Sequence, residues 1–148
     1  MEDTLAILKE YDFPPSQLWI EITERCRDLP ISMIKKTVTA FREAGIHITM
    51  DDYGTGSSSS QMMLELPVEG IKIDMFFVKD ILEEKKKQAL VIGMINFANA
   101  ADLRICIEGI ENDSLESYLR QFDVTCFQGY HYSRSICQDE LMKLLIKP

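Results

Sequence analysis

Several common sequence features are absent from this chain of 148 residues, and each absence excludes a class of protein. No apolar run reaches the ~20 residues that a membrane-spanning helix needs. The start, Met1-Glu2-Asp3, lacks the basic and apolar regions of a secretory signal peptide. Basic residues are outnumbered 16 to 24 by acidic ones, and the net charge of −8 disfavours a broad electrostatic interface with DNA or RNA. A small phosphorylated ligand remains compatible with this charge if metal ions mediate the contact.

Ligands for a zinc site are also scarce. The four cysteines show no Cys-x-x-Cys spacing, and the two histidines match no ligand spacing; these residues are Cys26, Cys106, Cys126, Cys137, His47 and His131. Cys106 and Cys126 lie within apolar strand patterns, so we expect both to be buried free thiols. Free thiols are typical of a cytoplasmic protein.

The chain shows no linker, no internal repeat and no low-complexity segment. With 46% hydrophobic and 27% charged residues, it has the composition and length of one globular domain, residues 1–148. Strand and helix patterns alternate along it. We expect strands at 18–23, 46–51, 68–74, 104–108 and 124–128, and helices at 4–11, 31–44, 59–66, 88–102, 113–122 and 138–146.

This alternation predicts right-handed crossovers and a mostly parallel sheet. An open doubly wound sheet and a portion of a (β/α) barrel both fit. Each expected strand has a polar residue in or at the end of its apolar run, namely Glu21, Asp51, Lys72, Glu108 and Gln128. Because active sites of (β/α) barrels lie at the carboxyl ends of the strands, this pattern favours the barrel.

The most informative pair is Asp51-Asp52, which follows the apolar stretch 46–50 and precedes Tyr53-Gly54-Thr55-Gly56. Adjacent carboxylates at the end of a buried strand repel each other and cost desolvation energy unless a cation lies between them. The pair therefore predicts a divalent-metal site and hydrolysis of a phosphate ester. A surface turn is the alternative, since Asp and Gly both favour turns.

Five ordered motifs extend this interpretation. They are Ile20-Glu21-Ile22-Thr23-Glu24, Asp51-Asp52-Tyr53-Gly54-Thr55-Gly56, Leu66-Pro67-Val68-Glu69-Gly70-Ile71-Lys72-Ile73-Asp74, Ile107-Glu108-Gly109-Ile110-Glu111 and Gln128-Gly129-Tyr130. In this order and at this spacing the chain closely resembles the EAL-domain family, bacterial phosphodiesterases that cleave the second messenger cyclic di-GMP. The resemblance extends from about residue 18 to residue 133.

The resemblance implies a TIM-type barrel and a site with two Mg²⁺ or Mn²⁺ ions. Glu21 resembles a metal ligand of the family, Asp51 the carboxylate that bridges the two ions, and Asp52 and Glu108 the ligands of the second ion. Carboxylate oxygens suit these hard cations. Lys72 resembles the lysine that orients the attacking water or offsets phosphate charge, so Lys72, Glu108 and Asp52 are the candidate catalytic residues. A solvated strand-end lysine is the alternative for Lys72.

Five further residues resemble supporting or ligand-contacting positions of the family: Glu24, Thr55, Asp74, Glu111 and Gln128. Glu24 is similar to the glutamate that anchors the loop after the Asp pair, where Thr55 offers a hydroxyl. For Asp74 and Glu111 a structural role is the alternative, because carboxylates favour the amino ends of helices.

The chain also departs from the family. It has no counterpart of the Glu-Ala-Leu strand or of a later asparagine, both ligands of the first ion. Since a complete barrel has roughly 250 residues, we expect an incomplete barrel of about five βα units. We also expect weak metal affinity, little turnover, and a homodimer or domain-swapped assembly in which strand 18–23 of one copy covers another.

Two functions therefore compete. One is a metal-dependent phosphodiesterase that opens cyclic di-GMP to the linear dinucleotide, impaired in this chain. The other is a catalytically silent regulatory module that binds cyclic di-GMP or a protein partner. A different barrel metalloenzyme is disfavoured by the ordered motifs.

Overall fold

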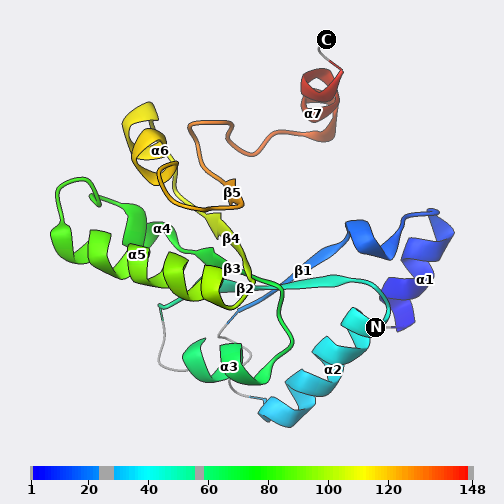
Figure 1. Cartoon of the computed structure of the whole chain (residues 1–148). Coiled ribbons are helices and arrows are strands. Elements are labelled where there is room, and N and C mark those ends of the chain that lie inside the picture. Colours follow the sequence, from blue (N-terminus) through cyan, green and yellow to red (C-terminus); the bar gives the residue numbers. More distant parts are fainter. Residues whose placement is uncertain (1, 24–28, 56–58, 147–148) are drawn as a thin grey trace.

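A computed structural model describes residues 2–23, 29–55 and 59–146. Five parallel strands form one sheet in chain order: β1 (Trp19–Ile22), β2 (His47–Tyr53), β3 (Gly70–Ile73), β4 (Arg104–Ile107) and β5 (Cys126–Phe127) (Figure 1). In the described residues β1 and β5 each pair on one side alone, so the sheet is open. The predicted parallel α/β architecture, an incomplete barrel, is confirmed.

The helices alternate with the strands. They are α1 (Glu2–Glu10), the 3-10 helix η1 (Pro15–Gln17), α2 (Ile31–Glu43), α3 (Ser59–Glu65), α4 (Met75–Val78), α5 (Lys85–Ala100), α6 (Asp113–Leu119) and α7 (Gln138–Leu145). Every helix in the described ranges is too short or too polar to cross a bilayer.

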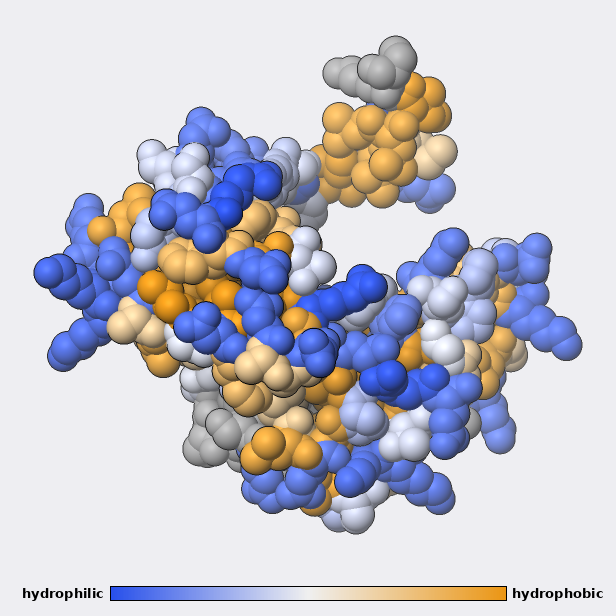
Figure 2. Space-filling view, viewed as in Figure 1, coloured by the Kyte–Doolittle hydropathy of each residue, from blue (hydrophilic) through white to orange (hydrophobic). Residues whose placement is uncertain are grey.

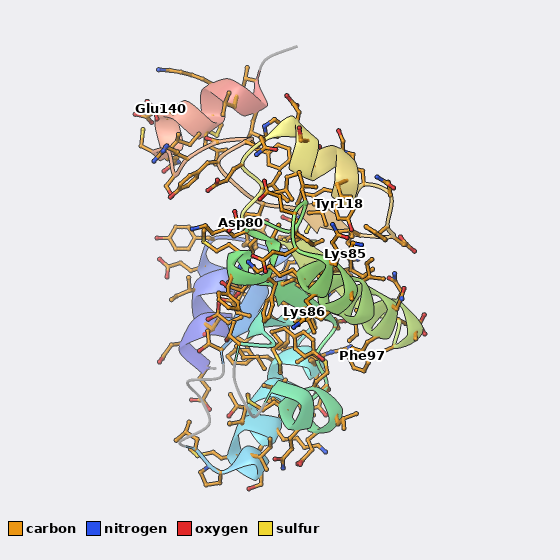
Figure 3. All side chains as sticks on the ribbon, turned by 90° about the vertical axis from the view of Figure 1, so that its left-hand side faces the viewer. Asp80, Lys85, Lys86, Phe97, Tyr118 and Glu140 are labelled. Carbon is orange, nitrogen blue, oxygen red and sulfur yellow. The ribbon has the colours of Figure 1, made fainter. Side chains whose placement is uncertain are left out.

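Most expected elements are confirmed, with differences at their ends. The sequence did not predict η1 or α4, which are single turns too short to show helical periodicity. Helix α5 begins at Lys85 rather than at residue 88. The apolar pattern did not reveal its first turn, because that turn is polar and exposed (Lys85 and Lys86 in Figure 3). Strand β5 comprises only Cys126 and Phe127, where five residues were expected.

One face of the sheet is apolar and holds the core. Its buried side chains alternate along the strands, as the pleat requires: Ile22, Ile48, Met50, Ile71, Ile73, Ile105 and Ile107. Helix α2 packs on β2 with Ile34 and Val38 buried, and α5 packs on β3 and β4 with Val91, Ile95 and Ala98 buried. The helices therefore cover this face and fix the direction of every other side chain along the strands.

The opposite face of the sheet is polar and faces a hollow of about 370 Å³. Residues from all five strands or from the chain just beyond them line it, including Trp19, Glu21, Lys72, Cys106 and Gln128. In a closed barrel this face would point into the packed interior. Here the interior face remains open on the side where the sheet is not closed.

This open face corrects one prediction about the thiols. Cys126 is exposed and Cys106 is half-buried, whereas both were expected in the core. The two residues are paired across β4 and β5 and lie in the same row as Lys72, on the hollow side of the sheet. Because β5 is an edge strand, little covers its cysteine.

Helix α7 stands apart from the sheet at the C-terminal end of the described chain (Figure 1). It has no buried residue, and four of its apolar side chains, Leu141, Met142, Leu144 and Leu145, are 45–69% exposed. Figure 2 shows hydrophobic surface gathered over α7, in the separate upper part of the molecule.

Candidate active site

Three carboxylates surround one ammonium group on the polar face of the sheet. Lys72 Nζ lies 2.6 Å from Glu108 Oε1, 3.0 Å from Glu21 Oε1 and 3.4 Å from Asp51 Oδ1. The Lys72 side chain is only 10% exposed. These four residues form one charged cluster, Glu21–Asp51–Lys72–Glu108. Its first and last members are 87 positions apart in the sequence.

Strand register explains why these side chains meet. Ile71 pairs with Met50 on one side and Ile105 on the other, and all three point into the apolar core. Since successive side chains of a strand alternate between faces, the next residue, Lys72, points to the hollow. Asp51 follows Met50 in the same way on β2.

The Asp pair lies at an irregularity in β2. Met50 pairs with Ile71, but Tyr53 pairs with Ile73, so β2 has one residue more than β3 between these two pairs. Asp52 has a left-handed φ of 54° at this point. A β-bulge of this kind re-aims side chains and is frequent beside active sites. The regular alternation of side chains between the two faces of the sheet is therefore interrupted at Asp51 and Asp52.

The surroundings of Lys72 keep it protonated. Burial acts to lower its pKa, but hydrogen bonds with Glu108 and Glu21 and the charges of Glu108 and Asp51 outweigh this and raise it. Lys72 is therefore an ammonium group at neutral pH. It can donate hydrogen bonds and offset negative charge, but it cannot act as a general base.

The cluster offers carboxylate oxygens of the type that a divalent cation binds, but Lys72 lies between them, and among the described residues their spacing does not form a ready-made coordination shell. Asp51 Oδ1 is buried and has no hydrogen-bond partner among the described atoms, although Lys72 lies at ion-pair distance. An unsatisfied buried carboxylate oxygen costs free energy unless a ligand or ion meets it. The neighbouring donors are all carboxylate oxygens, which Mg²⁺ and Mn²⁺ prefer to nitrogen or sulfur.

The turn after the Asp pair is closed by Thr55. Its backbone nitrogen and its Oγ1 both donate to the carbonyl of Asp52, at 3.1 and 3.0 Å. The hydroxyl thus shapes the turn after the Asp pair, and its supporting role at the site stays a prediction. Glu24, the expected anchor of this loop, lies outside the described residues.

The other three predicted residues lie near the cluster but not in it. Asp74 caps α4, where its Oδ1 accepts a hydrogen bond of 2.7 Å from the backbone of Phe76. Gln128 and Glu111 line a smaller cavity of about 180 Å³ beside Glu108. Asn112, not Glu111, caps α6 through Leu115 N at 3.0 Å. The helix-end alternative therefore holds for Asp74 alone.

Sequence reasoning missed two side chains in the hollow, Trp19 and Arg104. The Arg104 guanidinium lies 5.1 Å from the centre of the Trp19 ring, which also stacks on His47 at 4.4 Å. Both residues line the hollow with Glu21. Strict alternation from Glu21 back to Trp19, and from Glu108 back to Arg104, would have predicted them.

Comparison with known proteins shows the family to which this fold belongs. A family model described as EAL domain matches residues 1–135. The chain belongs to the EAL-domain family. Its fold matches the EAL domain of Mycobacterium smegmatis DcpA with a TM-score of 0.92 at 30% identity, over 97% of this chain and 65% of that one.

Two further EAL relatives have informative names. The cyclic di-GMP phosphodiesterase RocR of Pseudomonas aeruginosa is 30% identical over 142 residues, 95% of this chain and 36% of that protein. Klebsiella pneumoniae BlrP1, in a manganese and cyclic di-GMP complex, matches with a TM-score of 0.79 at 28% identity, over 86% of this chain and 32% of that one. Across the curated relatives this EAL chain spans 16–36% of their length.

Proposed function

We propose that this chain provides part of a metal-dependent phosphodiesterase site that hydrolyses cyclic di-GMP to the linear dinucleotide. The observation that supports this most is the buried Asp51 Oδ1, unsatisfied among the described atoms, inside a ring of carboxylates around Lys72. A binding surface with no metal has little use for such crowding of negative charge. Family membership adds the substrate class, because RocR is named as a cyclic di-GMP phosphodiesterase.

In this proposal Glu21, Asp51, Asp52 and Glu108 hold Mg²⁺ or Mn²⁺. Bound ions would supply an activated water and stabilise charge on the phosphate. Lys72, kept protonated by its neighbours, donates hydrogen bonds to a phosphate oxygen or to the attacking water. BlrP1 in its manganese and cyclic di-GMP complex is consistent with this assignment.

The residues around the cluster would hold the nucleotide. Gln128 and Glu111 line the cavity next to Glu108, and in this proposal they contact the ligand. Thr55 fixes the turn after the Asp pair, with Glu24 as its expected anchor. Asp74 supports the site indirectly by capping α4.

Turnover by this chain alone should be weak. The described sheet is open, and its hollow of about 370 Å³ is walled on the strand side only. Water therefore reaches the carboxylates from the open side and weakens each electrostatic contact.

The open sheet also favours self-association in the cytoplasm. Unpaired edges and exposed apolar surface promote pairing with another chain. Strand β1 offers one edge, and α7 adds Leu144 and Leu145, which are 53% and 69% exposed. We expect a homodimer or domain-swapped form in which β1 of one copy covers the other. Sedimentation velocity over a concentration series should show it, and a monomer at every concentration would contradict it.

A second function is a silent module that binds cyclic di-GMP or a protein partner. One observation favours it: the Lys72 ammonium already lies between the three carboxylates and neutralises part of their charge. Such a cluster is stable without metal and could serve recognition alone.

A hydrolysis assay with cyclic di-GMP and Mn²⁺ separates these functions. The wild type is compared with Asp51→Asn and with Asp123→Asn, an exposed carboxylate away from the cluster. Mn²⁺-dependent turnover that Asp51→Asn abolishes and Asp123→Asn retains supports the phosphodiesterase. Nucleotide binding by calorimetry without turnover supports the silent module. The absence of both turnover and binding would overturn both nucleotide functions.

A further inference from the structure

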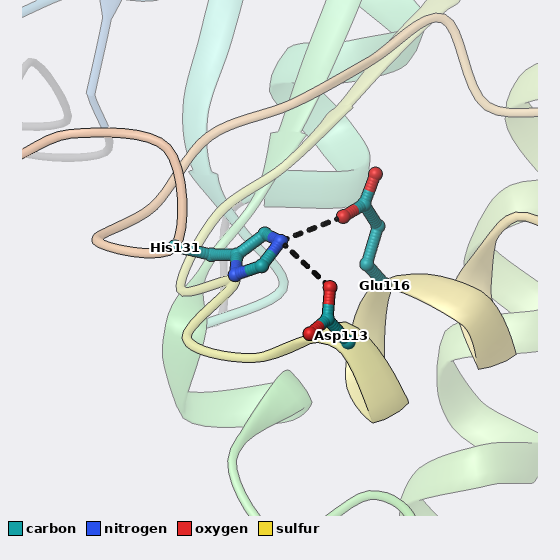
Figure 4. Close-up of side chains that lie close together, drawn as sticks. All are labelled: Asp113, Glu116 and His131. Carbon is teal, nitrogen blue, oxygen red and sulfur yellow. Dashed lines mark ion pairs between the residues drawn. The ribbon is translucent and has the colours of Figure 1, made fainter.

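A second cluster of ligand-type side chains lies away from the Lys72 site. Asp113 and Glu116, on the first turn of α6, face His131 from the loop after β5 (Figure 4). His131 Nε2 lies 3.0 Å from Glu116 Oε2 and 3.4 Å from Asp113 Oδ1. All three donor atoms lie within 4.8 Å of one another.

These distances match the edges of a zinc coordination shell. With zinc–ligand bonds of ~2.0–2.1 Å and tetrahedral angles, neighbouring donor atoms are about 3.3 Å apart. The two His131 distances, 3.0 and 3.4 Å, lie close to that value. One imidazole nitrogen with two carboxylate oxygens is a donor set that zinc accepts and that leaves a fourth position for water.

Neighbouring residues hold the central carboxylate in place. Glu116 Oε1 accepts a 2.7 Å hydrogen bond from Arg120 Nε, so Oε2 remains directed at His131. A further hydrogen bond joins Tyr132 to the same carboxylate. Outer partners of this kind orient metal ligands in many proteins.

Accessibility also suits an ion arriving from solvent. The Glu116 and His131 side chains are 13% and 24% exposed, while Asp113 is 95% exposed and free to adjust to a ligand. Two of the three side chains, Glu116 and His131, are therefore held in place, while Asp113 is accessible to solvent.

We propose that Asp113, Glu116 and His131 form a binding site for Zn²⁺ or a similar borderline divalent cation, separate from the oxygen-only site at Lys72. The cation joins α6 to the loop that follows Gln128 and Gly129. It thereby restrains the chain beyond the short edge strand β5, which has few contacts of its own. In the absence of the cation, His131 remains next to the same two carboxylates.

The sequence provides a direct probe, because His131 is one of only two histidines. The other, His47, pairs with Glu69 at 2.7 Å and stacks on Trp19, so it serves as an internal reference. Reduced protein, stripped of metal, is titrated with Zn²⁺ and with Mg²⁺ while NMR follows the side-chain nitrogens of both histidines. This readout is independent of zinc bound by thiols and of activity at the Lys72 site.

We expect Zn²⁺ to shift His131 Nε2 with saturation at one ion per chain, with His47 unchanged, and Mg²⁺ to shift neither. Asp113→Asn should raise the Zn²⁺ concentration needed for half of the His131 shift by at least about tenfold, while Glu83→Gln, another exposed carboxylate, leaves it unchanged. Asp113 is too exposed for its replacement to unfold the protein. If Zn²⁺ did not shift the His131 resonance, or shifted it at the same concentrations in Asp113→Asn as in the wild type, the proposal would be overturned. The three side chains would then form only an ion-pair network.

Discussion

Lys72 Nζ lies 2.6 Å from Glu108 Oε1, and this contact bridges the end of β4 and the neighbouring strand β3. The same ammonium group contacts Glu21 on β1 and Asp51 on β2. A single positive charge thus compensates carboxylates contributed by three other segments of the sheet. In metal-free protein this lysine is the main reason that the carboxylates can remain close together.

Replacing Lys72 by methionine tests this compensation. Lys72→Met retains the length of the side chain but leaves three carboxylates with no cation, so the free energy of unfolding should fall by about 3 kcal/mol. Mn²⁺ should restore part of that loss by mass action. Urea denaturation with and without Mn²⁺ measures both effects. Lys85→Met, on the exposed start of α5, is the control and should change stability by less than about 0.5 kcal/mol.

An equal stability of Lys72→Met and the wild type in metal-free buffer would contradict the compensating role. A loss that Mn²⁺ fails to reduce would instead argue that the carboxylates do not bind metal.

The sequence predicted a parallel sheet because strand and helix patterns alternate along the chain. It also predicted the polar residue of each strand, because that residue lies in or at the end of an apolar run. Glu21 and Asp51 lie in strands and Glu108 directly follows one, and their sequence neighbours are clearly apolar, so their direction follows from the pattern. Their convergence on Lys72, however, depends on register and on the bulge at Asp51-Asp52. Neither the bulge nor the register is encoded in periodicity.

The exposure of Cys126 and the contact of His131 with α6 could not be predicted for a different reason. Cys126 lies in an apolar pattern, and only the open edge of the sheet exposes it. His131 meets Glu116 through a loop whose path is set by tertiary contacts, including His131 N to Ile110 O at 2.9 Å. Local patterns contain no information on either relationship.

Two glycines should respond in opposite directions to alanine. A Cβ at Gly129 would overlap the backbone of Ile110, with its carbonyl carbon at 2.7 Å, so the two segments must separate. Gly129→Ala should destabilise the protein by about 2 kcal/mol or more and weaken nucleotide binding near Gln128. Gly93 lies on the exposed face of α5 with no atom within 4 Å of its Cβ position. Gly93→Ala should stabilise the protein by about 1 kcal/mol. Thermal or urea unfolding of both variants measures the contrast, and a loss of stability in both would refute it.

Cys106 and Cys126, which are neighbours across β4 and β5, should differ in the reactivity of their free thiols. Burial, followed by a hydrogen bond with Cys126, raises the pKa of the Cys106 thiol, so Cys106 remains protonated and unreactive. Cys126 is exposed. Iodoacetamide at neutral pH should therefore alkylate Cys126 well before Cys106, as peptide mass spectrometry can show. Cys126→Ser should leave Cys106 slow, because burial is the larger cause. Equal alkylation rates for the two thiols in the wild type would contradict this account.

The raised pKa of Lys72 predicts how its contribution to stability changes with pH. Its ordinary value is 10.5, and the folded state holds the proton more tightly than the unfolded state does. The stabilisation is therefore fully present below about pH 10 and is lost only as the pH rises through the higher pKa of the folded protein. Acylation with acetic anhydride at about pH 9 should accordingly modify the exposed Lys85 and Lys86 quickly and spare Lys72 (Figure 3).

Low reactivity of Lys72 could come from burial alone, and Glu108→Gln separates the two causes. Glutamine keeps the volume of Glu108 but removes the charge that holds the proton on Lys72. If electrostatics protect the amine, Lys72 should become several-fold more reactive in Glu108→Gln, while Lys85 and Lys86 are unchanged. If its rate stays at the wild-type value, shielding by the surrounding side chains explains the protection and the charge of Glu108 does not.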